Sequence, residues 1–316
     1  MTTQRSTEPG QPPRPAAGSD ISVIVATRNR PRQIAACLRA LSAQTYPRDR
    51  FDVIVVDDGG DLSLAPAMAT FRAQLRLQLV EQTNGGPARA RNTGAKHATG
   101  PLLAFVDDDC EPSPGWLAAL QAHFQQCPDR ALGGRTVNAL PANAYSSASQ
   151  LVVDYLYEHQ AAASVRNGER APAAAPFFAS NNLAVPAALF DAVGGFDESF
   201  PLAAGEDREF CDRWQAYGYR LLVAPDAVVQ HAHALSFKTF WRQQMNYGRG
   251  AYRLRKARSA RGAAAMGFEP LSFYGRLVTY PIRAPRHRSA LLLAALILVS
   301  QVAIVLGYVF EMRRRP

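Results

Sequence analysis

Three consecutive aspartates, Asp107, Asp108 and Asp109, follow the apolar run 102–106. A short apolar run that ends in clustered carboxylates is typical of a buried strand that delivers acids to the edge of a sheet. Neighbouring carboxylates repel one another, so burying them requires a compensating cation. Hard oxygen ligands suit Mg²⁺ or Mn²⁺, ions that are commonly shared with phosphate groups. On the triplet alone, a solvated acidic loop is the alternative.

Two earlier apolar runs also end in polar side chains. Thr27 and Asn29 come directly after the first run, and Asp57 and Asp58 come after the second. The runs alternate with segments of helical periodicity, which predicts an α/β fold with a Rossmann-like, mainly parallel sheet and helices on both faces. Ligands on such sheets bind beyond the carboxyl ends of the strands. We therefore expect these residues and the aspartate triplet at one site.

The spacing of apolar residues predicts where each element lies. The pattern is less regular between residues 130 and 180, although 146–160 has helical spacing and 177–186 suits a strand or loop. The predicted strands are 21–26, 51–56, 77–81, 102–106 and 221–224, and the predicted helices are 31–43, 64–75, 88–97, 114–126, 146–160, 190–193 and 208–217.

The net charge of +9 is unevenly distributed along the chain. Residues 237–288 contain twelve Lys or Arg and one acid, Glu269, so the part before them is mildly acidic. A nucleic-acid-binding protein would line a recognition surface with its basic residues, so we expect no nucleic acid as a partner. Of the four cysteines none forms a C-x-x-C pair, which indicates free thiols in a reducing compartment.

The C-terminal region contains one long apolar segment. Residues 290–310 are 21 residues without a charge, and a helix of that length spans roughly 30 Å at about 1.5 Å per residue. A buried core helix is the alternative. Arginines on both sides and the basic stretch 249–261 favour a single-pass anchor in the cell membrane, with the catalytic domain in the cytoplasm.

These compositional changes divide the chain into segments. The first residues are rich in Pro, Gly, Ser, Thr and Gln and contain no apolar core of a signal peptide, which predicts disorder. The predicted segments are a disordered tail 1–19, a globular domain 20–248, a basic juxtamembrane or interfacial segment 249–288, a transmembrane helix 289–311 and a basic tail 312–316.

Six segments, taken together and in order, resemble family 2 glycosyltransferases, over about residues 20–250. The resemblance implies a GT-A fold and a nucleotide-diphosphate-sugar donor, linked to UDP, GDP or dTDP. It also implies a divalent metal, Mg²⁺ or Mn²⁺. The segments are Ser22–Arg30, Val55–Gly59, Asn84–Asn92, Phe105–Asp109, Gly194–Glu198 and Gly205–Trp214.

The resemblance implies which residues meet the nucleotide sugar. The Asp58 carboxylate would accept a hydrogen bond from the base, although a turn residue before Gly59 is the alternative. Arg89 or Arg91 would meet phosphate, and the other would lie on a solvated helix face. The implied donor-contacting residues are Thr27, Asn29, Asp58, Gly86, Arg89, Asn92, Asp107 and Asp108.

The resemblance also implies a metal site at the aspartate triplet. Asp109 would bind the metal directly, with Asp107 as the other acid of the D-x-D motif and Asp108 on the ribose. The spacing does not decide which acid touches the metal. His231, or His233 after it, would be a further ligand, because imidazole suits Mn²⁺. A loop histidine without a role is the alternative.

Asp207 is the implied general base, which would deprotonate an acceptor hydroxyl, and Glu206 is the second candidate. Attack from the face opposite the nucleotide would invert the anomeric configuration. Acids at the start of a helix are also favoured by the helix dipole alone, so a purely structural role is the alternative.

The predicted activity is the transfer of a single sugar to a lipid-linked or envelope glycan. Polymerising members of the family carry Gln-x-x-Arg-Trp after the base, whereas this chain has Phe240-Trp241-Arg242-Gln243-Gln244 and one apolar span rather than a channel-forming set. Two alternatives remain: a nucleotidyltransferase, and a non-catalytic, membrane-bound protein that binds nucleotide sugars.

Overall fold

The fold is described from a computed structural model, which describes residues 19–166, 177–263, 267, 269–283 and 289–314. Nearly all of the predicted tail 1–19 therefore lies outside the described residues. The strands are β1 (Ile21–Thr27), β2 (Phe51–Asp58), β3 (Leu77–Gln82), β4 (Leu102–Phe105), β5 (Cys110–Pro112), β6 (Arg130–Asn138), β7 (Leu183–Pro186) and β8 (Arg220–His231).

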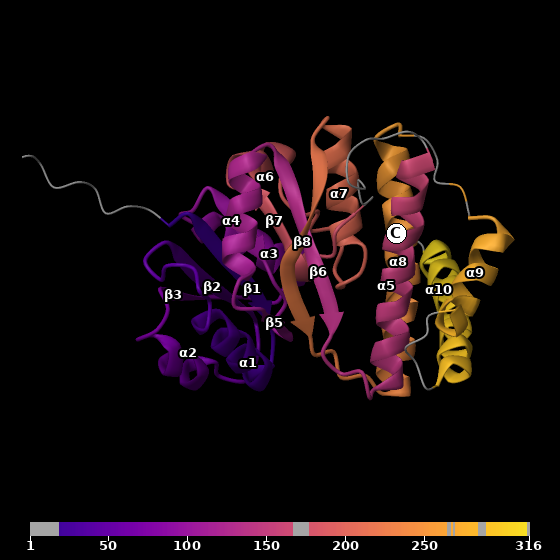
Figure 1. The fold of residues 1–316 in the computed structure, drawn as a ribbon, viewed down its shortest axis with the longest axis horizontal. Helices are drawn as coiled ribbons and strands as arrows, with labels where there is room; N and C mark the ends of the chain where they lie inside the picture. Colours follow the sequence, from indigo (N-terminus) through magenta and orange to yellow (C-terminus); the bar gives the residue numbers. More distant parts are fainter. Residues whose placement is uncertain (1–18, 167–176, 264–266, 268, 284–288, 315–316) are drawn as a thin grey trace, which may run out of the picture.

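Helices connect most of these strands, as Figure 1 shows. A short 3₁₀ turn, Ser180–Asn182, precedes β7. The helices are α1 (Pro31–Ser42), α2 (Ala65–Phe71), α3 (Pro87–His97), α4 (Trp116–Gln126), α5 (Ala144–Arg166), α6 (Ala187–Val193), α7 (Glu206–Ala216), α8 (Phe237–Ala260), α9 (Leu271–Arg283) and α10 (Ala290–Arg313).

The eight strands form one mixed sheet in the order β3-β2-β1-β4-β7-β6-β8-β5. The half β3-β2-β1-β4 is parallel, as the alternating pattern predicts. In the other half β7 runs antiparallel to both of its neighbours, and β5 runs antiparallel to β8. The α/β prediction is confirmed, and the sheet is mixed because β7 and β5 run against their neighbours.

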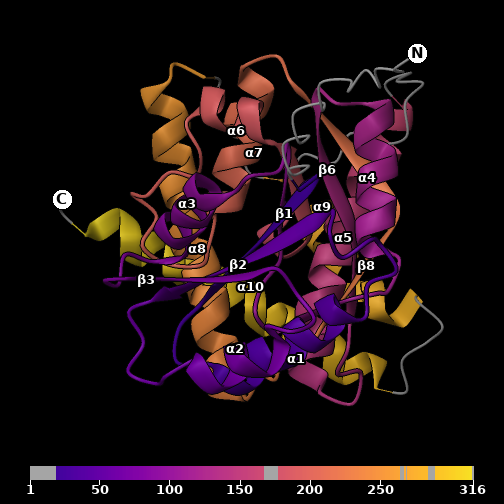
Figure 2. The same ribbon diagram turned by 90° about the vertical axis from the view of Figure 1, so that its left-hand side faces the viewer.

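Helices cover both faces of the sheet because the strand side chains alternate between two apolar cores. Val23 and Val25 of β1 face the core formed with α1, α2 and α4. Ile24 faces the opposite core, formed with α3, α6 and α7. In Figure 2, α1 and α2 lie on one side of the strands β1 to β3 and α3 on the other. The predicted two-faced covering is therefore confirmed.

Parallel pairing brings the polar strand ends to one edge. Thr27 at the end of β1 pairs with Asp57 of β2, and Ile24 pairs with Phe105 at the end of β4. Asp107, two residues beyond β4, therefore lies near the end of β1. The sequence predicted this convergence from strand order alone.

Several parts of the fold were not predicted from the sequence. β5 is absent from the predicted strands, β6 fell in the region of irregular pattern, and β8 is much longer than the predicted strand 221–224. The extension of β8 pairs His231 with Cys110 of β5, which brings a residue from late in the chain beside the aspartate triplet. Helix α8 was not among the predicted helices, and it continues across the boundary predicted between residues 248 and 249.

Helices α5, α8, α9 and α10 pack together as a layer beside the sheet (Figure 1). The backbones of α8 and α10 approach closely at two glycines. A β-carbon on Gly248 would overlap the carbonyl oxygen of Ile304, and one on Gly307 would overlap that of Met245. α10 is long and apolar enough to cross a membrane, but one side of it is covered by this layer.

We expect Gly134→Ala to destabilise the fold by about 1–3 kcal/mol. A β-carbon there would overlap the backbone oxygen of Ala227 on β8, which cannot move without breaking its hydrogen bond from Asn182. The free energy of unfolding in urea measures the effect.

The control for this substitution is Gly275→Ala, in α9, where an added β-carbon meets nothing within 4 Å. Alanine in a helix interior should leave stability unchanged or raise it by up to about 1 kcal/mol. Equal stabilities of the two variants would contradict the close approach at Gly134.

Candidate active site

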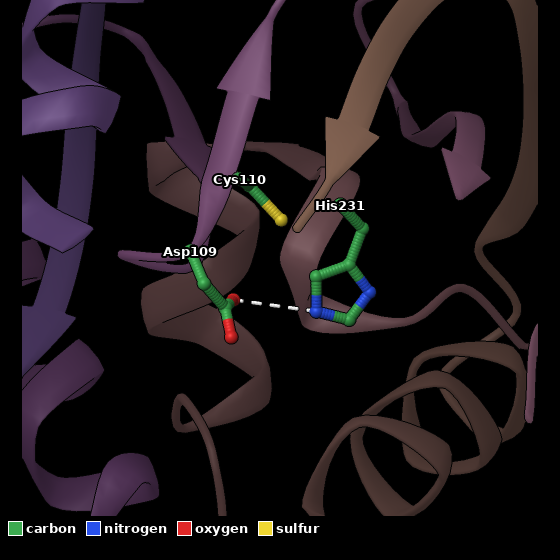
Figure 3. A group of neighbouring side chains, drawn as sticks. All are labelled: Asp109, Cys110 and His231. Carbon is green, nitrogen blue, oxygen red and sulfur yellow. Dashed lines mark ion pairs between the residues drawn. The ribbon is translucent and has the colours of Figure 1, made fainter. Parts of the chain in front are cut away.

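The site lies at the edge where β1, β2 and β4 end, and β8 completes it. Asp109 directly precedes Cys110 of β5, and His231 ends β8 beside it, as Figure 3 shows. The Nε2 atom of His231 lies 3.3 Å from Oδ1 of Asp109. Asp108 and Asp109 are both buried. The solvated acidic loop, weighed as an alternative from the sequence, is thereby excluded.

Arg30 holds two of the three aspartates. Its Nη1 lies 2.6 Å from Oδ1 of Asp108, and its Nη2 lies 2.7 Å from Oδ2 of Asp109. Thr27 donates a hydrogen bond of 2.6 Å to the second oxygen of Asp108. The sequence prediction named Thr27 but not Arg30, although a cation just after β1 was the available signal, since clustered carboxylates require one.

The pKa values of the neighbouring acids Asp108 and Asp109 are shifted in opposite directions. Burial would raise the pKa of Asp109, but the hydrogen bond and charge of His231, with Arg30, hold it well below its usual range. Burial raises the pKa of Asp108 to about 7 and outweighs Arg30 and Thr27. Although burial alone would lower the pKa of His231, Asp109 raises it. The negative charge is therefore concentrated on Asp109, beside an imidazole.

A buried guanidinium joins the aspartate triplet to the acids of α7. Nη2 of Arg91 lies 2.7 Å from Asp107, and Nη1 lies 3.0 Å from Oε1 of Glu206. Burial would lower the pKa of Arg91, but Asp107 and Glu206 outweigh it and raise that pKa above its ordinary value. Arg89 is instead exposed. Of the two arginines left open by the sequence, Arg91 therefore holds the site together.

Glu206 and Asp207 begin α7 directly after Gly205, whose φ of 91° favours glycine. Glu206 is buried, and its Oε2 has no hydrogen-bond partner in the described part of the chain. Burial and then the neighbouring Asp207 raise the pKa of Glu206 to about 7. Burial also raises the pKa of Asp207, whose Oδ1 accepts a hydrogen bond from the backbone of Arg208. Two carboxyls poised to hold or take a proton thus lie beside Arg91.

The Asp58 carboxylate is occupied by the loop that follows β3. One oxygen accepts hydrogen bonds from Gln82 and from the Gly85 backbone, and the other accepts them from Asn84 and from the Gly86 backbone, at 2.7–2.9 Å. In this structure Asp58 shapes the loop that begins α3, and its predicted contact with a base stays a prediction.

Two predicted donor-contacting amides also hold loops. Asn29 adopts a left-handed conformation, with φ of 56°, and its Oδ1 accepts hydrogen bonds from the backbones of Asp61 and Leu62. Asn92 exchanges two hydrogen bonds of 2.9 Å with the backbone of Phe196. The polar atoms of both side chains form hydrogen bonds within the protein, so their predicted contacts with the donor stay predictions.

The donor atoms beside Asp109 fit a divalent metal of the Mn²⁺ type. One ligand atom each from Asp109, Cys110 and His231 lies within 4.8 Å of the others. Carboxylate oxygen and imidazole nitrogen suit Mn²⁺. Burial raises the pKa of the Cys110 thiol well above its ordinary value, and soft sulfur suits Mn²⁺ less well than oxygen or nitrogen does. His233 lies near Gln243, with its Nδ1 3.2 Å from the amide nitrogen, which favours His231 as the ligand.

The fold and the acids at this edge define the class of the protein as a GT-A glycosyltransferase. The model for glycosyl transferase family 2 matches residues 22–181, and the model for glycosyl transferase family group 2 matches residues 102–312. The chain belongs to glycosyl transferase family 2. Membership favours sugar transfer over the nucleotidyltransferase and non-catalytic alternatives.

Among curated relatives, the chain is similar to glycosyltransferase AglE of Haloferax volcanii, at 30% identity over 73% of this chain and 72% of that protein. It is also similar to a validoxylamine A glucosyltransferase of Streptomyces hygroscopicus subsp. limoneus, at 31% identity over 68% of this chain. The matched region spans only 52% of the latter protein.

Solved structures support the fold. The chain aligns with the mannosyltransferase PcManGT of Pyrobaculum calidifontis, in complex with GDP-Man and Mn²⁺, with a TM-score of 0.63 and 22% identity over 97% of this chain and 92% of that one. It also aligns with Staphylococcus aureus TarS 1-349 in complex with UDP-GlcNAc, with a TM-score of 0.54 and 20% identity over 93% of this chain and 90% of that one.

The raised pKa of Glu206 predicts a pH-dependent stability. The native state holds the Glu206 proton up to about pH 7, whereas the unfolded chain releases it near the ordinary pKa of 4.5. The free energy of unfolding should therefore fall as pH rises through this interval. The side chain of the Glu206→Gln variant cannot ionise, so its free energy of unfolding should fall less over the same pH interval. Urea titrations with a metal chelator present measure both curves.

Glu81→Gln, at an exposed position of β3, is the matched control and should follow the wild-type curve. Parallel curves for wild type and Glu206→Gln between pH 4.5 and 7 would contradict the assignment of a buried, protonated Glu206.

Proposed function

We propose that the protein is a metal-dependent, inverting glycosyltransferase that moves one sugar from a nucleotide-diphosphate sugar to an acceptor hydroxyl. The observation that carries this proposal is the ion bridge of Arg91. One side of its guanidinium pairs with Asp107 of the proposed metal site, and the other pairs with Glu206, next to the proposed base. The solved neighbours were determined with GDP-Man, UDP or UDP-GlcNAc, which supports a nucleotide-sugar donor here.

Asp109 and His231 would hold the metal, with Asp107 close by and still able to offer its second oxygen. A bound Mg²⁺ or Mn²⁺ would neutralise charge on the diphosphate and on the departing nucleotide. Arg30, which pairs with Asp108 and Asp109, adds a further positive charge at this edge of the sheet. Asp108, whose two oxygens contact Thr27 and Arg30, is the proposed ribose contact.

Asp207 is the proposed general base. Asp207 is half-buried, and a carboxylate with a raised pKa takes a proton more readily than one with an ordinary pKa, which suits removal of the acceptor hydroxyl proton as the new bond forms. Glu206 stays the second candidate, although its Oε1 is occupied by Arg91. A base that acts across the sugar from the leaving nucleotide gives inversion at the anomeric carbon.

The proposed acceptor is a lipid-linked or envelope glycan, and the proposed location is the cytoplasmic side of the cell membrane. The apolar helix α10 and the basic residues that precede it support membrane attachment. The single crossing expected from the sequence is the simplest form of that attachment, and the packing of α10 bears on it below.

We expect Asp207→Asn to lower the rate of sugar transfer by about 10²–10⁴-fold, because it removes the proton acceptor while keeping the shape of the side chain. Transfer of labelled sugar to an extract of cellular lipids and glycans measures the rate, and donor affinity should stay unchanged. Asp226→Asn, at an exposed acid beside His123 on α4, is the matched control. If Asp207→Asn transfers sugar at the wild-type rate and Glu206→Gln does not transfer it, Glu206 and not Asp207 is the base.

Asp109→Asn should weaken Mn²⁺-dependent donor binding by at least about tenfold, because a metal ligand loses its charge. Calorimetric titration with a panel of UDP-, GDP- and dTDP-sugars, with Mn²⁺ or with chelator, measures this. His231→Ala should weaken binding in the same direction. If the wild type binds the donor equally well with and without metal, the proposed metal site at Asp109 and His231 is wrong.

A further inference from the structure

The apolar helix α10 has one covered side and one uncovered side. At 3.6 residues per turn the uncovered residues fall on one face of the helix, and the buried ones, such as Ile297 and Ser300, fall on the opposite face. The large exposed apolar residues of α10 are Leu291, Leu292, Leu298, Val302, Val305, Leu306, Phe310 and Met312.

The covered face of α10 is bound to α8 along most of its length. Close backbone approach at Gly248 and Gly307 leaves no room for lipid between the two helices. At the C-terminal end Glu311, which is buried, pairs with Arg249 at 2.8 Å and with Arg253. A buried carboxylate held by two arginines of α8 fastens α10 to the protein rather than to a bilayer interior.

The packing of α8 sets the depth of α10 relative to charged residues of the protein. Phe240 of α8 packs in one apolar cluster with Leu293 and Ile297, in the first half of α10. Lys238 and Arg242, both exposed, flank Phe240 on α8. If α10 crossed a bilayer in this arrangement, these two charged side chains would lie at the depth of the hydrocarbon core, where charged groups are expensive.

Charge on this side of the molecule favours a lipid surface. Within α9 and α10 the only acid is Glu311, and it is buried. The exposed charged residues of these two helices are all arginines, Arg276, Arg283 and Arg313, and Arg314 follows directly. Leu271 and Ile282 of α9 add exposed apolar side chains. An amphipathic helix with arginines, such as α9, is typical of the interface of an anionic membrane, and α10 lies against it.

We propose that α10 lies along the surface of an anionic bilayer, with its uncovered face in the headgroup region and its covered face on α8, and does not cross the membrane. This inference rests on the proposed membrane attachment but not on the proposed reaction. It places the bilayer on the side of α10 that faces away from α8.

The first test is binding of the purified full chain to vesicles. We expect it to float with vesicles of phosphatidylcholine and phosphatidylglycerol at 7:3, and at least about tenfold less with phosphatidylcholine alone. The double variant Leu298→Glu and Val305→Glu should lose binding at least about tenfold and keep its fold. Tyr217→Glu, at an exposed aromatic residue just beyond α7, is the control and should bind as the wild type does. Unchanged binding of the double variant would overturn the proposal.

The second test separates a surface helix from a crossing helix. In sealed inside-out membrane vesicles, a C-terminal epitope tag should be digested by protease together with the catalytic domain, because both lie on the same side. A tag that stays protected while the domain is digested would establish a single crossing and overturn the proposal. Sugar transfer measured in detergent reports on the proposed reaction independently of either result.

Discussion

The buried ion bridge of Arg91 is the interaction on which the rest of the site depends. A guanidinium with almost no access to water needs acceptors for its N–H groups, and Arg91 finds two of them on acids that are far apart in the sequence. Asp107 lies beyond the end of β4, and Glu206 begins α7. The bridge therefore fixes the spacing between the aspartate triplet and the acids of α7, and removal of either acid would leave the buried Arg91 with one acidic partner.

Much of the fold followed from the sequence because its parallel half has strong local signals. Apolar runs that end in acids, such as 102–106 before Asp107, predict both a strand and the edge at which it ends. β6 lacks that signal, because Gly133 and Gly134 interrupt it, and they are needed where the Phe178 ring and the Ala227 backbone approach. α8 mixes charged and polar residues with glycines, since it packs between two layers rather than on one apolar core.

The candidate site was predictable in its chemistry but less so in its contacts. The three aspartates, Asp207 and His231 belong to recognisable local patterns. Which partner each one takes depends on packing between distant elements, so the ion pairs of Arg30 and Arg91 were not predicted, and the phosphate contact of Arg89 stays a prediction. The apolar composition of α10 has the same limitation, because composition cannot distinguish a side chain covered by lipid from one covered by α8.

The four hydrogen bonds that Asp58 accepts have a consequence for ligand affinity. The loop from Gln82 to Gly86 is ordered when the protein folds, so the conformational entropy of that loop is lost before any donor arrives. A nucleotide sugar that binds over the loop would meet a preorganised surface and would not bear the cost of ordering it. Asp58 would then contribute to affinity through the order of the loop, in addition to any contact with the ligand itself.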